Sequence, residues 1–148
     1  MTTLDTVLRE ITTLGFDTAP LIYFVECHPI YLPIIRDIIK RIDQGVMQGC
    51  ASVITLTEVL VQPKRCGKTA LEKEYRDILL HSRNFELISI DAEIAEQAAA
   101  LRSRYNLRTP DALQIAASLS AGCEAFLTND KQLKRVEDLA VLVLDDFV

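Results

Sequence analysis

Five acidic residues stand where a carboxylate could take part in chemistry. Asp17, Asp91 and Asp130 each follow a segment with a strand pattern, whereas Glu58 and Asp111 fall in the first turn of predicted helices. Helices that follow parallel strands begin along one edge of the sheet, so carboxylates placed there can converge. Because converging carboxylates repel one another unless cations lie between them, this pattern indicates a site for divalent cations.

The residue types also indicate which ion and which reaction. Carboxylate oxygens are hard ligands that suit Mg²⁺ or Mn²⁺. The four cysteines include no C-x-x-C pair that would indicate a zinc ribbon or a thiol-redox motif, so we expect reduced thiols. Ions held by acids can bind a phosphate, activate a water and stabilise the attacking and leaving oxygens. Hydrolysis of a phosphodiester is the chemistry that this arrangement favours.

Each acid also has a purely structural explanation. A carboxylate at a helix N-terminus accepts backbone N–H bonds and stabilises the helix by roughly 0.5–2 kcal/mol. The segment from Thr55 to Glu58 matches the capping-box pattern. Spacing alone does not separate helix caps from ligands.

The hydrophobic pattern predicts alternating strands and helices. Strands are expected at 11–16, 50–54, 85–90, 125–128 and 140–144, and helices at 21–26, 30–46, 55–61, 68–81, from residue 92 on, 109–121 and 130–135. Pro63 is expected to end the helix at 55–61. Strands separated by helices call for a mainly parallel sheet, so the expected fold class is a three-layer α/β/α sandwich. We expect one domain over residues 1–148, with 1–10 as a lead-in.

Four segments together resemble the successive motifs of the PIN-domain family. They are Gly15–Glu26, Thr57–Leu60, Thr109–Ala117 and Phe126–Asp130, and they occur in the family's order across nearly the whole chain. Ala19, where many members carry a polar residue, and Gln132, where some carry a further acid, depart from the pattern.

The resemblance assigns roles to particular residues. It implies that Asp17, Glu58, Asp111 and Asp130 are the catalytic, metal-binding acids, with Asp91 left as a helix cap. Thr18 and Thr128 look like the family's supporting hydroxyls, which would orient the acids through hydrogen bonds.

The resemblance further implies a Mg²⁺- or Mn²⁺-dependent ribonuclease that cuts RNA internally, similar to the toxin of a VapBC-type toxin–antitoxin pair. A separate small antitoxin protein and pairing of the chain with itself would then be expected. A free-standing RNA-processing nuclease and a non-catalytic module that binds RNA or protein share the fold. A phosphate-accepting receiver domain fits less well, because it needs an acidic pair where Asp17 stands alone.

Charge and hydropathy give a mixed indication of partners. Basic residues at predicted helix ends could contact RNA phosphates, namely Lys64, Arg65, Arg108 and Lys131. The net charge of −5 disfavours a nucleic-acid substrate, although bound cations would add positive charge at the site. No apolar run approaches the roughly 20 residues of a membrane span, and the N-terminus lacks a secretion pattern, so we expect a cytoplasmic protein.

Overall fold

A five-stranded, wholly parallel sheet forms the centre of the molecule in the computed structural model, which describes residues 3–148. The strand order is β3-β2-β1-β4-β5. The strands are β1 (Thr13–Phe16), β2 (Gln48–Ser52), β3 (Phe85–Ile88), β4 (Ala125–Thr128) and β5 (Ala140–Val143). The predicted α/β class with a mainly parallel sheet is confirmed.

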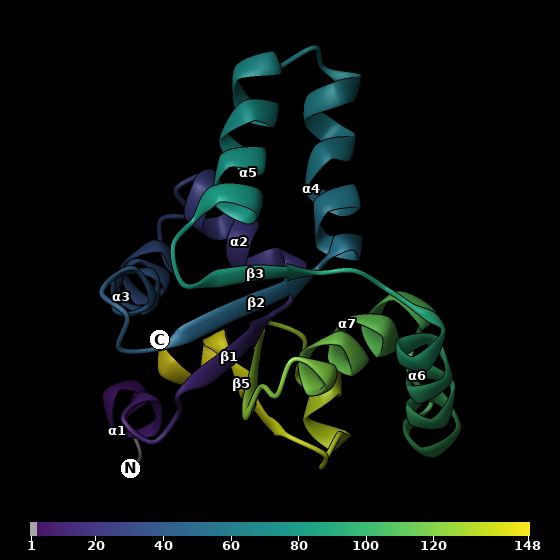
Figure 1. The fold of residues 1–148 in the computed structure, drawn as a ribbon. Coiled ribbons are helices and arrows are strands. Elements are labelled where there is room, and N and C mark those ends of the chain that lie inside the picture. The colour runs from purple at the N-terminus through teal and green to yellow at the C-terminus, as the bar shows by residue number, and fades with distance from the viewer. Residues whose placement is uncertain (1–2) are drawn as a thin grey trace.

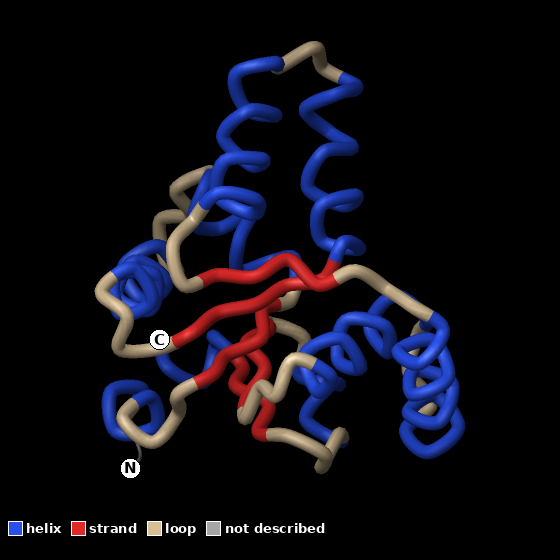
Figure 2. Tube along the Cα trace, viewed as in Figure 1, coloured by secondary structure: helices blue, strands red, loops and turns tan. Residues whose placement is uncertain are grey.

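Helices cover both faces of the sheet (Figures 1 and 2). The α-helices are α1 (Leu4–Leu8), α2 (Thr18–Val25), α3 (Leu32–Asp43), α4 (Val53–Arg65), α5 (Thr69–His81), α6 (Ala92–Tyr105) and α7 (Thr109–Ser120), and two short 3₁₀ helices are η1 (Lys131–Arg135) and η2 (Leu144–Phe147). In the part of the chain that is described, no helix has both the length and the hydropathy needed to cross a bilayer.

Two apolar cores fill the space between the layers. Side chains alternate across a strand, so Leu127 packs in the core that includes Leu14 and Ile38, whereas Phe126 packs against α6 and α7 with Ile115. The two cores hold the sheet between its helical layers.

The strand order reverses beside β1, and this reversal positions the site. The chain runs from β1 outward through β2 to β3, then returns to the other side of β1 as β4. Binding sites in parallel sheets form at such a switch point, outside the carboxyl ends of the strands. Asp17 follows β1 at this point, and Thr128 ends β4.

The helix that carries Glu58 begins earlier and ends later than the sequence predicted. Ser52 caps α4 by accepting the N–H of Ile54 at 3.2 Å, so the predicted capping box at Thr55 is wrong. Pro63 lies inside α4 rather than ending it, and is buried, with α4 packed along α5. The proline disturbs few backbone hydrogen bonds, because Pro63 lies near the end of α4. The packing of α4 against α5 offsets the remaining cost.

The other boundaries differ by a few residues. The helix predicted from residue 21 already begins at Thr18, because Asp17 is its N-cap. Helix α3 is shorter than the predicted 30–46, and the strands at 11–16 and 85–90 each lose two residues at one end. Within the predicted lead-in, residues 4–8 form α1, while residues 1–2 lie outside the described part of the chain.

Candidate active site

The four predicted acids line a single pocket of about 330 Å³. They come from four separate elements, because Asp17 precedes α2, Glu58 lies in α4, Asp111 opens α7, and Asp130 precedes η1. Six other residues complete the lining: Thr18, Ala19, Ile22, Tyr23, Arg108 and Asn129. Residues up to 113 positions apart in sequence therefore share one opening at the carboxyl edge of the sheet.

Asp17 is the most firmly held of these acids. Its Oδ1 accepts the N–H of Thr18 at 2.8 Å and the side-chain amide of Gln114 at 3.1 Å, and its Oδ2 accepts the hydroxyl of Thr128 at 2.7 Å. Burial raises the pKa of Asp17, and the charges of Asp111 and Glu58 add to this, while the bonds from Thr128 and Thr18 oppose it. The balance disfavours the ionised carboxylate in the absence of a cation.

Thr18 connects Asp17 to the acid on α4, because its N–H donates to Asp17 and its hydroxyl to Glu58. The Thr18 hydroxyl donates to Glu58 Oε1 at 2.7 Å and lies 3.0 Å from the hydroxyl of Thr55. Since Thr55 donates its single proton to Gln114 Oε1 at 2.6 Å, the proton of Thr18 is free for Glu58. The hydroxyls of Thr18 and Thr128 thus contact two of the acids, Glu58 and Asp17.

Gln114 joins this network at its centre, and neither Gln114 nor Thr55 was assigned a functional role from the sequence. The Gln114 side chain is 2% exposed, and its amide nitrogen lies 3.1 Å from Asp17 Oδ1, 3.3 Å from Thr18 Oγ1 and 3.3 Å from Glu58 Oε1. A long polar side chain among the buried residues of α7 was the available signal, because buried polar groups need partners.

Arg108 is the one basic residue in the pocket lining. Its Nε donates to Asp111 Oδ2 at 3.0 Å, with the Arg108 side chain 77% exposed and that of Asp111 only 11%. The bond with Asp111 raises the pKa of Arg108 most, and the charges of Asp111, Asp130 and Glu58 also raise it. Three of the four acids therefore stabilise the charged form of the guanidinium.

Asp130 and Asp91 both cap helices, but only Asp130 also lines the pocket. Asp130 accepts the N–H of Gln132 at 2.9 Å, and its own N–H donates to Thr128 Oγ1, so it caps η1 while lining the pocket. Asp91 caps α6 by accepting the N–H of Ile94 at 2.9 Å and does not line the pocket. Asp91 is thus placed as a cap alone.

Three of the four basic residues expected to contact RNA lie outside the lining. Lys64 pairs with Glu72 at 2.9 Å, and Lys64, Arg65 and Lys131 are all exposed. Arg108 is the exception.

The donor chemistry of the pocket fits a hard divalent cation. All four acids supply carboxylate oxygens, and neither cysteine nor histidine belongs to the lining. Among residues 3–148, no three His, Cys, Asp or Glu side chains are close enough to form a ready-made ligand set. Gln114 and Arg108 already bond to three of these carboxylates. A bound cation would offset the burial that mainly raises the pKa of Asp17, and the smaller repulsion from Asp111 and Glu58.

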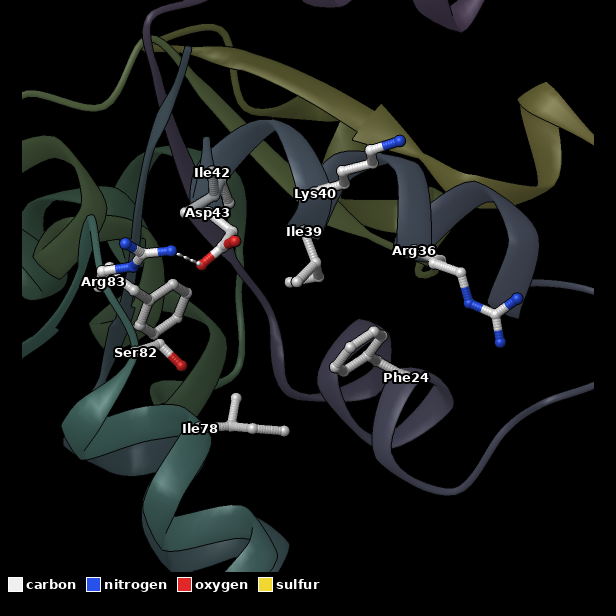
Figure 3. A pocket seen from close by; sticks show the side chains of 10 residues that line it. Phe24, Arg36, Ile39, Lys40, Ile42, Asp43, Ile78, Ser82 and Arg83 are labelled. Atoms are coloured by element: carbon white, nitrogen blue, oxygen red, sulfur yellow. Dashed lines mark hydrogen bonds and ion pairs between the residues drawn. The ribbon is translucent and has the colours of Figure 1, made fainter. Parts of the chain in front are cut away.

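A second cavity of about 380 Å³ opens between α2, α3 and α5 (Figure 3). Phe24, Ile39 and Ile78 face its interior, and the ion pair between Arg83 and Asp43 at 3.2 Å lies at one side. None of the four predicted acids lines it. The cavity is therefore separate from the acid pocket.

A profile of the PIN domain matches residues 16–139. The chain belongs to the PIN-domain family. A search of curated protein sequences finds no match.

Solved structures of toxin–antitoxin complexes contain chains similar to this PIN domain. A toxin–antitoxin complex from Klebsiella pneumoniae matches with 27% identity and a TM-score of 0.68, over 88% of this chain and 97% of that one. VapBC2 from Rickettsia felis, bound to a promoter DNA fragment, matches with 18% identity and a TM-score of 0.71, over 89% and 98%. DNA-bound VapBC from Salmonella typhimurium matches with 17% identity and a TM-score of 0.67, over 90% and 98%. At these lower identities, the last two establish the fold only.

Proposed function

We propose that this PIN domain is a Mg²⁺- or Mn²⁺-dependent endoribonuclease and the toxin of a VapBC-type toxin–antitoxin pair. The observation that carries the proposal is the gathering of Asp17, Glu58, Asp111 and Asp130 around one pocket at the switch point of the sheet. The similar chain in the toxin–antitoxin complex from Klebsiella pneumoniae supports the biological role.

Different residues of the pocket have different roles in the proposed reaction. A divalent cation held by the four acids would supply charge for the phosphate and lower the pKa of a water that attacks it. Thr128, Gln114 and the N–H of Thr18 fix the orientation of Asp17, so its oxygens are positioned before the substrate binds. Arg108 is exposed on the rim, where its guanidinium can exchange Asp111 for an RNA phosphate.

The activity is tested with purified protein, a labelled single-stranded RNA, and either Mg²⁺, Mn²⁺ or a chelator. We expect metal-dependent cleavage by the wild type and loss of cleavage in Asp17→Asn and Asp111→Asn. Asp91→Asn is the matched control, because it makes the same chemical change at a helix cap outside the pocket. Cleavage that survives both pocket substitutions would contradict the assignment of these acids as the metal-binding residues. Absence of cleavage with every metal would leave a non-catalytic binding module.

The partners follow from the same proposal. The chain is expected to pair with itself, to bind a small antitoxin protein encoded beside it, and to act in the cytoplasm. Light scattering on the purified chain measures the first, and co-purification with the product of the adjacent reading frame, followed by loss of RNA cleavage, measures the second. A monomer that no neighbouring gene product inhibits would point to a free-standing processing nuclease.

A further inference from the structure

Two buried cysteines face each other on the α7 side of the sheet, outside the acid pocket. Cys50 lies in β2 and Cys123 in the turn between α7 and β4, and their Sγ atoms are 2.9 Å apart. Both are free thiols and are separated by 73 positions in the chain. Since a disulfide bond is about 2.05 Å long, the two sulfurs need to approach by less than about 1 Å to form one.

The backbone fixes this approach from both sides. Gly15 of β1 pairs with Cys50, and a Cβ at Gly15 would lie 2.1 Å from Ser118 Oγ, so the glycine lets the end of α7 pack against the sheet. Gly122, with φ +80°, turns the chain after α7, and the N–H of Cys123 donates to Ser118 O at 2.9 Å. The close contact between the sulfurs thus results from β2, β1 and α7 together.

A small oxidant can reach the pair, and the two thiols differ in reactivity. Cys50 and Cys123 both line an open pocket of about 370 Å³ whose other walls include Gln48 and Glu86. The hydrogen bond with Cys123 lowers the pKa of Cys50, opposed by burial and aided by Ser118 Oγ at 4.0 Å, while the same contact and burial raise the pKa of Cys123. Cys50 is therefore the thiol that ionises first and attacks.

We propose that Cys50 and Cys123 form an intramolecular disulfide when a peroxide oxidises Cys50. The Cys50 thiolate attacks one oxygen of the peroxide, an S–O bond forms, the O–O bond breaks, and the leaving hydroxide takes up a proton to become water. Cys123 then attacks the Cys50 sulfur, the S–S bond forms, and the S–O bond breaks. The second hydroxide leaves with the proton of Cys123 as water, so two thiols and one hydrogen peroxide give one disulfide and two waters.

The test uses the full chain with Cys27→Ser and Cys66→Ser, which removes the two exposed thiols and keeps the buried pair. After one equivalent of hydrogen peroxide, we expect the thiols titrated in denaturant to fall from two to none. The mass should fall by two hydrogens, one peptide should contain both cysteines, and a reductant should restore both thiols. On a denaturing gel without reductant, the protein should run as a single chain.

Two single variants complete the test. Adding either Cys50→Ser or Cys123→Ser to that background should abolish disulfide formation within the chain, and one of them suffices if the other does not fold. Retention of both thiols, a gain of oxygen atoms without a cross-link, or a covalent dimer would overturn the proposal. The readout is independent of RNA cleavage, so it holds or fails apart from the proposed nuclease activity.

Discussion

Replacing Asp17 by asparagine should stabilise the metal-free protein, although Asp17 caps a helix. Asparagine is as good an N-cap as aspartate, and its oxygen can still accept the N–H of Thr18 and the amide of Gln114. Two things change: the charge is removed, and the Thr128 hydroxyl, which donates to Asp17 Oδ2, would instead accept from the new amide group. Because burial raises the pKa of Asp17 above its ordinary value of 3.8, ionising this side chain costs more in the folded protein than in the unfolded chain.

The sign of the pH dependence follows from that shift. Below pH 3.8, Asp17 is protonated in both states, and its contribution to stability is fully present. As the pH rises through the raised pKa of the folded state, this contribution is lost. Since the unfolding free energy depends on every titratable group, the informative quantity is the difference in unfolding free energy between wild type and Asp17→Asn. This difference should shift toward the variant as pH rises.

Divalent cations should reverse the order of stability. Four carboxylates and one guanidinium line the pocket, which gives a formal charge of −3 when all are ionised, and Asp17→Asn reduces it to −2. A cation at about 100 times its dissociation constant adds about 2.7 kcal/mol to the unfolding free energy of the protein that binds it. For a chain of this size, that corresponds to a rise in Tm of roughly 5–10 °C, most of which the variant should lose.

Calorimetric melting from about pH 4 to about pH 8, with a chelator or with Mn²⁺, measures both effects. Asp91→Asn is the control, because Asp91 caps α6 outside the pocket, and its melting should respond to Mn²⁺ as the wild type does. The reasoning is refuted if Asp17→Asn loses stability relative to wild type as pH rises without metal, or gains the same Tm increase from Mn²⁺. Asp17 would then act as an ordinary cap.

Three other substitutions or treatments probe the same structure. Gln114→Met should keep the fold by circular dichroism but lower Mn²⁺ affinity and RNA cleavage about 10–100-fold, because the acids lose a donor that orients them; unchanged affinity would refute this. Arg108→Gln should leave the unfolding free energy nearly unchanged, since its pair with Asp111 is exposed on one side, yet tighten Mn²⁺ binding in titration calorimetry. Joining Cys50 to Cys123 closes a loop of 73 residues, so oxidation should stabilise the fold by about 4 kcal/mol and raise Tm on the order of 10 °C in calorimetry.

The sheet and its helices were largely predictable, because apolar segments of strand length alternate with helical patterns along the chain. The exact start of α4 was not. Ala51, Ser52, Val53 and Ile54 suit either a buried strand or a helix, and hydrogen bonding decides between them. Ser52 both ends β2 and caps α4, so Thr55 moves into the helix and becomes available to Gln114.

The acids of the pocket were found through the order of their motifs, whereas their supporting network was found only in the structure. The acceptors of the Gln114 amide lie 97, 96 and 56 positions away, on Asp17, Thr18 and Glu58. No local pattern encodes such distances. The basic residues show the converse, because Lys64 at a helix end pairs with Glu72 rather than facing the acids.

The choice of donor at the centre of the pocket explains how acids can be held together without cancelling their charge. Gln114 is buried and neutral, and its one amide bonds to acids on two different elements. A lysine or arginine in that place would also satisfy the carboxylates, but its positive charge would remove the field that attracts a divalent cation. The one cation in the lining, Arg108, is instead exposed at the rim, where solvent weakens its pair with Asp111 and leaves it free to exchange partners. With the neutral Gln114 at its centre and the exposed Arg108 at its rim, the pocket stays strongly negative while its carboxylate oxygens remain ordered.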